Sequence, residues 1–415
     1  MNVSYFVYEF PPRLVGGLGT YAADMTIQLV RRGHNISVFT MNDGRQLLRE
    51  LWRGVEVTRP LTSDISEILF AILHPSFERW GRGIKFFGDV LAYNIASSSI
   101  LLNDFIKKEG RKVDIVSVHD WLSILAGVSI KKELKVPMVF HVHSTERGRT
   151  FGGGSQAIIS LEYEGAKHSD LVVTVSHAMR DELLSLGFEE RKIRVIYNGI
   201  DTEKWNPKRV SPEEIAKLRE RYGVTEKDPL ILFVGRLTGV KGVDRLVMAM
   251  PHILRKIPTA KLVIIGIGDL QGHLDNLIGT LNIQKNVIRR YEFMGDEEKM
   301  THYAACDVAV FPSLYEPFGI VSLEAMSMSK PVVVGARDVS GMREQVVPSG
   351  PEQCGFHINP HDPSDIAWGV ISAVSNRDLN QTFGRNARMR AEHFFTWERA
   401  ADATIKAYEE ALSGQ

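Results

Sequence analysis

Two glutamates, Glu316 and Glu324, stand eight positions apart across a predicted turn. Pro317 and Gly319 mark that turn, and a helix is expected to begin directly after it. Backbone N–H groups at a helix start attract anions, and here they belong to Phe318, Gly319, Ile320 and Val321. Glu324 would lie more than one turn into the helix, where its carboxylate can accept hydrogen bonds from hydroxyl groups. The alternative is that Glu316 only caps the helix and Glu324 only lies on its face.

Two cations, Arg236 and Lys241, follow the apolar segment 230–235 within a glycine-rich stretch. The carboxyl end of a parallel strand is where α/β sheets bind their ligands. A guanidinium can bridge two phosphate oxygens, and an ammonium adds a point charge. This pattern favours a phosphate site, because the flanking glycines allow the backbone to approach a ligand closely. The alternative is a pair of solvated surface cations.

A second glycine-rich turn joins the apolar segment 3–10 to a predicted helix. It contains Gly16 and Gly17, and it matches neither the dinucleotide fingerprint nor the phosphate loop of nucleotide triphosphatases. The turn could admit an anion at the helix start, or it could serve only as a tight connection.

Histidines close two apolar segments of the first half, 114–118 and 137–143. His143 ends the second segment, where a parallel strand would point its side chain toward a ligand. His119 has the same position after the first segment. We expect His141 to point away from His143 and to be structural. The alternative for His119 and His143 is a buried histidine whose hydrogen bonds are all satisfied.

Short apolar segments alternate with longer amphipathic stretches along the whole chain. Continuous apolar runs indicate strands buried on both faces, and strand–helix–strand repetition indicates parallel sheets. We predict an α/β protein with two Rossmann-like domains, and a charged linker with a short helix at 201–229. The first domain spans 1–205 and is completed by a terminal helix within 395–415, and the second spans 206–394.

Composition excludes several classes of protein. The chain has 50 Lys and Arg residues and 50 Asp and Glu residues, so it lacks the net positive charge with which many proteins attract nucleic acid. The two cysteines, Cys306 and Cys354, are too few for a disulfide scaffold and lack zinc-site spacing, so we expect buried thiols. The first ten residues do not resemble a signal peptide, and no apolar run reaches 18 residues. We therefore expect a cytoplasmic protein.

These segments together resemble the retaining nucleotide-sugar glycosyltransferases of the GT-B fold, in particular glycosyltransferase family 4. Glu316 and Glu324 match its E-x7-E motif, and the resemblance also includes Glu9-Phe10-Pro11-Pro12, Asn198-Gly199-Ile200-Asp201 and the ending at Phe395 and Trp397. The triplet His119-Asp120-Trp121 is similar to the glycogen and starch synthase branch. The resemblance covers nearly the whole chain and implies two domains that face each other across a cleft.

The resemblance also implies residue roles. Arg236 and Lys241 would bind the diphosphate of the donor, Glu316 and His143 the transferred hexose, and Glu324 the ribose. The backbone N–H groups of Phe318, Gly319, Ile320 and Val321 would contact the sugar or the distal phosphate. Gly16 and Gly17 would contact the donor. His119, Asp120 and Trp121 would lie on the acceptor side.

The chain departs from the synthase pattern at some positions. Leu14 stands where the bacterial synthases carry a lysine, which weakens the expectation of an ADP-glucose-dependent glucan synthase. No two aspartates stand two apart, so there is no D-x-D metal motif. We therefore expect transfer without a metal or other cofactor, since cations and helix termini can neutralise the leaving diphosphate.

The expected activity is retaining transfer of a hexose, with glucose the expected sugar, from a UDP- or ADP-sugar to an α-glucan or sugar acceptor. One alternative is a transferase at the membrane surface that glycosylates a lipid through an aromatic and basic patch at 77–87. That patch could equally bind the acceptor or be a helix that packs its aromatics on the first domain. Another alternative is a non-catalytic nucleotide-sugar-binding protein. The nucleobase, the acceptor and the oligomeric state are not determined by the sequence.

Overall fold

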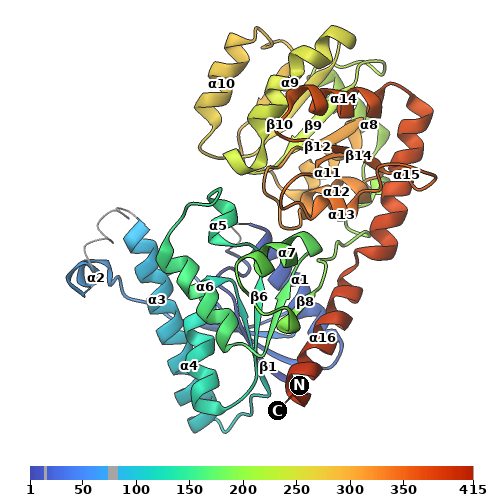
Figure 1. Ribbon diagram of the computed structural model, residues 1–415. Helices are drawn as coiled ribbons and strands as arrows, with labels where there is room; N and C mark the ends of the chain where they lie inside the picture. The colour runs from blue at the N-terminus through green and yellow to red at the C-terminus, as the bar shows by residue number, and fades with distance from the viewer. Residues whose placement is uncertain (14–15, 73–82, 415) are drawn as a thin grey trace. The chain divides into compact units, whose positions relative to one another are not determined.

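The computed structural model describes residues 1–13, 16–72 and 83–414. The chain divides into two compact units (Figure 1). Unit 1 contains 1–175, 183–196 and 400–415, and unit 2 contains 176–182 and 197–399. The sequence placed residues 176–182, 197–205 and 395–399 with the first domain, whereas here they group with unit 2. Among the described helices, none is both long and apolar enough to cross a bilayer.

Unit 1 is built on an eight-stranded sheet in the order β3-β4-β2-β1-β5-β6-β7-β8. All neighbours are parallel except β3 and β4. The strands are β1 (Asn2–Phe6), β2 (Asn35–Phe39), β3 (Arg49–Trp52), β4 (Val55–Thr58), β5 (Ile115–His119), β6 (Met138–Val142), β7 (Leu171–Thr174) and β8 (Ile193–Val195). The sheet order reverses between β1 and β5, which makes the carboxyl ends of these strands the expected ligand edge.

The helices of the first half connect these strands. They are α1 (Gly17–Arg31), α2 (Ser66–Ile72), α3 (Gly83–Ile100), which continues as a π-helix over Leu101–Lys108, α4 (Ile124–Leu134), α5 (Glu146–Arg149), α6 (Gln156–His168) and α7 (His177–Ser185). Helices α3, α4 and α6 lie side by side (Figure 1). The final helix, α16 (Trp397–Ser413), joins unit 1 from Ala400 onward, as the sequence predicted for a terminal helix.

Unit 2 contains a wholly parallel six-stranded sheet in the order β11-β10-β9-β12-β13-β14. The strands are β9 (Leu230–Val234), β10 (Lys261–Ile265), β11 (Val287–Arg290), β12 (Val308–Phe311), β13 (Val332–Gly335) and β14 (Gly355–Ile358). The helices are α8 (Pro212–Arg221), α9 (Val243–Lys256), α10 (Gln271–Thr280), α11 (Asp296–Ala305), α12 (Ile320–Ser327), α13 (Met342–Gln345), α14 (Pro363–Val374) and α15 (Arg377–Phe394). Its strand order reverses between β9 and β12.

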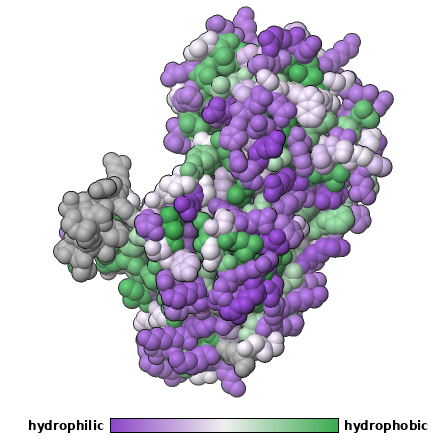
Figure 2. All heavy atoms as spheres, in the orientation of Figure 1, coloured by the Kyte–Doolittle hydropathy of each residue, from purple (hydrophilic) through white to green (hydrophobic). Residues whose placement is uncertain are grey.

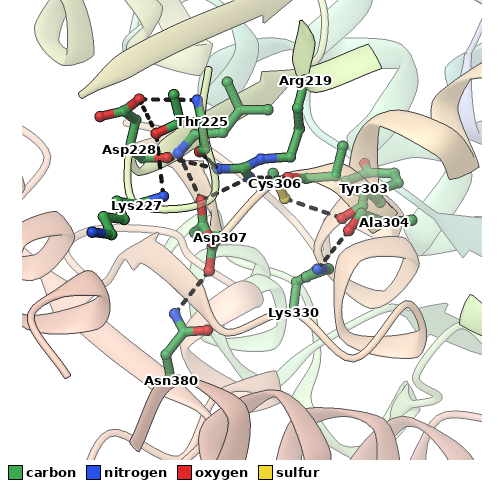
Figure 3. A network of polar contacts seen from close by, with 12 residues as sticks. Arg219, Thr225, Lys227, Asp228, Tyr303, Ala304, Cys306, Asp307, Lys330 and Asn380 are labelled. Carbon is green, nitrogen blue, oxygen red and sulfur yellow. Dashed lines mark hydrogen bonds and ion pairs between the residues drawn. The ribbon is translucent and has the colours of Figure 1, made fainter. Parts of the chain in front are cut away.

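A polar network ties the ends of several elements of unit 2 together (Figure 3). Arg219 of α8 donates to the carbonyls of Thr225, Asp228 and Ala305, each at 2.7 Å. Asp307 accepts from Arg219 at 3.2 Å and from the backbone N–H of Leu230 at 2.8 Å. Because these groups lie at the amino ends of β9 and β12, the network holds the two strands at the edge opposite to their carboxyl ends.

Most buried side chains of each unit are apolar, and hydrophilic side chains cover most of the face visible in Figure 2. The central strands β9, β12 and β13 of unit 2 are buried along their whole length, whereas the edge strand β11 is partly exposed. Helices α9 and α14 contact each other and share the same hydrophobic core. The two cysteines are buried free thiols, as the composition predicted.

Candidate active site

Lys241 and Glu316 form an ion pair at the carboxyl edge of the unit 2 sheet. The Lys241 ammonium lies 2.5 Å from Glu316 Oε2, although 75 positions separate the residues. Lys241 follows β9 and Glu316 follows β12, the two strands between which the sheet order reverses. The pair therefore occupies the place where open α/β sheets bind their ligands.

The surrounding backbone holds Glu316 firmly. Its N–H donates to the carbonyl of Val339 at 2.9 Å, and its carbonyl accepts from Gly341 at 2.8 Å. Ser313 donates to the same carboxylate oxygen at 3.3 Å. Glu316 is only 7% exposed, so its carboxylate depends on Lys241 and Ser313 for compensation of its burial. The sequence did not single out Ser313, although it stands three residues before the motif glutamate.

The turn before α12 requires glycine at position 319. Gly319 has φ +88°, and an added Cβ would lie 2.3 Å from the Cε of Met342. Gln345 donates to the carbonyl of Phe318 at 2.8 Å and supports the same turn. The hydrogen bonds of the described chain leave the backbone N–H groups of residues 318–321 without an acceptor. They form the predicted helix start beside Glu316.

Arg236 and the glycines around it complete this edge. Arg236 is exposed, and no ion pair or hydrogen bond links its guanidinium to any other described residue. Gly242 has φ +63°, and an added Cβ would lie 2.1 Å from the carbonyl oxygen of Pro312. Gly266 and Gly268 after β10 approach the same loop so closely that a Cβ would meet the carbonyls of Gly235 and Leu237. These two glycines were missed, although a G-x-G at a strand end was visible in the sequence.

Glu324 lies in a second buried cluster of unit 2. It is 7% exposed, and its partners are Lys299 at 3.4 Å and the Tyr303 hydroxyl at 3.1 Å. Burial raises the pKa of Glu324 above its usual value, and Lys299 offsets this only in part. Burial also works against the charge of Lys299, but Glu324 and Asp296 together raise its pKa. Sequence reasoning missed Lys299 and Tyr303, because they reach Glu324 from a different helix, α11.

In unit 1, the three histidines of β5 and β6 gather in one place. One nitrogen atom from each of the three imidazole rings lies within 4.8 Å of the corresponding nitrogen of the other two rings. The expectation that His141 points away from His143 was wrong. Residues two apart in a strand share a face, and register places His119 directly opposite His141. Burial lowers the pKa of His119, His141 and His143.

Asp120 and Trp121 differ in their surroundings. Asp120 has φ 52° and ψ 178°, a conformation that is costly for a residue with a side chain. Its carboxylate accepts the backbone N–H of His143 at 2.7 Å, so it fixes the chain beyond β6. Trp121 is only 4% exposed and stacks on Phe87 with ring centroids 6.3 Å apart. Its indole is therefore part of the packing between α3 and β5.

The glycine-rich turn that contains Gly16 and Gly17 has free space around Gly16. Gly16 is extended, has nothing within 4 Å of an added Cβ, and donates its N–H to Glu9 at 3.1 Å. Gly17 begins α1. Leu14 and most of the 77–87 patch, including Phe77 and Trp80, lie outside the described residues. Of the patch, Phe87 is buried and Phe86 is 44% exposed.

Glu162 of α6 is a buried carboxyl group at the start of α5. It is 3% exposed and accepts the backbone N–H of Glu146 at 2.8 Å. Burial raises the pKa of Glu162 to about 8, while the Glu146 N–H and Arg149 act in the opposite direction. The side chain is therefore largely protonated at neutral pH.

We expect Glu162→Gln to stabilise the protein at pH 8 but not at pH 5. Between pH 4.5 and about 8 the folded chain holds a proton here that the unfolded chain has released. The free energy of unfolding therefore falls as pH rises, by at most about 1.4 kcal/mol per pH unit for one proton. Glutamine keeps an acceptor for Glu146 and removes this slope. Denaturant unfolding at both pH values measures it, with Glu164→Gln on the exposed side of α6 as control. Parallel pH profiles for wild type and Glu162→Gln would contradict the prediction.

Solved structures share this architecture over the full chain. Sucrose-phosphate synthase from Thermosynechococcus elongatus is similar with a TM-score of 0.80 and 21% identity, covering 100% of both chains. Anabaena HepE, in complex with UDP-glucose, has a TM-score of 0.73 and 21% identity, again covering 100% of both chains. At this level of identity the likeness shows the fold. The protein has the GT-B fold of two parallel α/β units, as predicted.

Sequence comparison identifies the family. Residues 15–204 match the model Glycosyltransferase Family 4, and residues 214–390 match Glycosyl transferases group 1. An uncharacterized glycosyltransferase of Methanocaldococcus jannaschii is 34% identical and covers 99% of both chains. A glycogen synthase of Mycobacterium tuberculosis is 29% identical, covering 100% of this chain and 96% of its own. The chain therefore belongs to the family 4, group 1 glycosyltransferases, and it has glycogen synthase homologues.

Proposed function

We propose that the protein transfers a hexose, with glucose the favoured sugar, from a UDP- or ADP-sugar to an α-glucan or sugar acceptor, with retention of configuration. The observation that carries this proposal is the Lys241–Glu316 pair at the β9–β12 switch point, beside an exposed Arg236. The glycogen synthase among the relatives supports a glucan acceptor. The UDP-glucose bound by HepE supports a nucleotide-sugar donor.

The proposed substrate contacts follow from the chemistry of each residue. Arg236 and Lys241 bind the donor diphosphate, together with the N–H groups of 318–321. Glu316 and His143 contact the hexose, and Glu324 accepts hydrogen bonds from the ribose. The other assigned contacts are Gly16 and Gly17 to the donor, and His119, Asp120 and Trp121 on the acceptor side.

The reaction depends on the charge that develops on the leaving diphosphate. Cations and helix N–H groups that are already in place stabilise this charge without reorganising. The hexose passes through an oxocarbenium-like transition state, as in glycoside hydrolysis. Side-chain cations and helix N–H groups can neutralise the leaving group, so we propose transfer without a metal ion.

A panel of UDP-, ADP- and GDP-sugars, each with maltooligosaccharide, glucose or no acceptor, tests the proposal. We expect release of UDP or ADP from a glucose donor, with elongation of the oligosaccharide and an α-linkage by NMR. Donor turnover without elongation would contradict the glucan acceptor, and a β-linkage would contradict retention. Nucleotide-sugar binding without turnover under every condition would favour a binding protein. Transfer only to lipid in anionic vesicles would favour a membrane-surface enzyme.

A further inference from the structure

A continuous chain of hydrogen bonds runs through the buried interior of unit 1 to His143. The Tyr408 hydroxyl of α16 donates to Ser117 Oγ at 2.8 Å. Ser117 Oγ lies 3.0 Å from His119 Nε2, and His119 Nδ1 lies 3.1 Å from His143 Nε2. Tyr408, Ser117 and His119 are fully buried, so water cannot replace any of these partners.

The direction of the first hydrogen bond sets the direction of the others. Tyr408 has one proton and two neighbours, Ser117 Oγ at 2.8 Å and His141 Nε2 at 3.3 Å. We assign the proton to the shorter contact, which leaves the Ser117 proton for His119 Nε2. Because burial keeps His119 neutral, the single ring proton of His119 is then on Nδ1 and is donated to His143 Nε2. His143 is also neutral, so its own proton is on Nδ1.

His141 completes the network from the other side. Its Nε2 lies 3.3 Å from the Tyr408 oxygen, and its Nδ1 lies 3.5 Å from the Tyr21 hydroxyl. With Tyr408 donating to Ser117, His141 Nε2–H donates to Tyr408. Within the described chain, both ring nitrogens of His119 and of His141 therefore have hydrogen-bond partners, and His143 Nδ1 has none.

We propose that the relay formed by Tyr408, Ser117 and His119 fixes His143 as the neutral Nδ1–H tautomer, which leaves this N–H to donate to a hydroxyl of the bound hexose. The ligand assignment rests on the proposed function, but the tautomer does not. Asp120 holds the His143 backbone at the same time, so main chain and ring are both fixed. Tyr408, Ser117 and His119 are positioning residues, since they act through His143.

The alternative interpretation of this cluster is that the three histidines bind one metal ion. An ion must lie in the plane of each ring that binds it, but His119 and His141 are stacked, with centroids 4.4 Å apart and planes 22° apart. Their lone pairs therefore run roughly parallel and do not converge. Each nitrogen of these two rings also has a hydrogen-bond partner that an ion would have to displace.

The test is proton–nitrogen NMR of the full chain with ¹⁵N-labelled histidine and without donor, with peaks assigned through His143→Gln. We expect the neutral Nδ1–H pattern for His143 in the wild type and a second, Nε2–H population in Tyr408→Phe. Ser117→Ala should cause the same change if Tyr408→Phe does not fold. Tyr93→Phe is the matched control, because it removes another fully buried hydroxyl, which donates to the Phe39 carbonyl at 2.8 Å. It should leave His143 unchanged.

Three outcomes would overturn the proposal. They are an Nε2–H His143 in the wild type, an unchanged tautomer in folded Tyr408→Phe and Ser117→Ala, and binding of added Zn²⁺ that shifts all three histidines together. In transfer assays Tyr408→Phe should lower kcat/KM by about tenfold, the effect of one hydrogen bond. A correct tautomer with no turnover of any donor would leave the relay standing and would instead contradict the proposed function.

Discussion

Lys241→Met is expected to lower hexose transfer by about a thousandfold, the range seen when a charge-stabilising group is removed from an active site. In the proposed mechanism Lys241 faces the diphosphate as it becomes a leaving group. Methionine keeps much of the length and apolar stem of the side chain and removes only the charge. The loss should appear mainly in kcat, because the charge on the diphosphate grows in the transition state. Initial rates with the preferred donor measure it.

The same substitution leaves the Glu316 carboxylate buried without its cation. We expect this to cost about 3 kcal/mol of stability, so activity must be compared on folded protein. The double variant Lys241→Met with Glu316→Gln should recover most of the stability and none of the activity. Lys131→Met is the matched control, since Lys131 on α4 of unit 1 forms a partly buried 2.5 Å pair with Asp170, the residue before β7. Near-normal transfer by folded Lys241→Met would remove Lys241 from the mechanism.

Glu316→Gln should lower kcat by about a hundredfold with a smaller change in KM for the donor. Glutamine retains the shape of the side chain and an oxygen for Ser313, but it loses the charge that holds Lys241 at 2.5 Å. A neutral amide also stabilises positive charge on the hexose less well than a carboxylate does.

Glu324→Gln provides the comparison for Glu316→Gln. Glu324 is equally buried and is proposed to bind the ribose, which does not react. Its substitution should raise KM for the donor and change kcat little, since ribose contacts are the same in ground state and transition state. Equal effects of the two substitutions on kcat would contradict the separate roles.

Several features of the fold could be predicted because their signals are local. Buried parallel strands are continuous apolar runs, so the segments around β5, β6, β9 and β12 were found within one or two residues of their ends. The strand β3 (Arg49–Trp52) was missed, since it is an antiparallel edge strand of only four residues, none of which is buried. The start of α12 was placed correctly by Pro317 and Gly319.

The sequence by itself determined the two parallel α/β halves, the family, and the positions of Arg236, Lys241, Glu316 and His143 after strands. These depend on chain-local patterns of apolar residues, glycines and motif spacing. Only the tertiary structure decided which side chains meet. Lys241 pairs with Glu316 because β9 and β12 are neighbours in the sheet. Strand order brings His119, His141 and His143 together, and α16 adds Tyr408 from 265 or more positions away. Such contacts depend on packing between distant segments, for which one sequence carries no local signal.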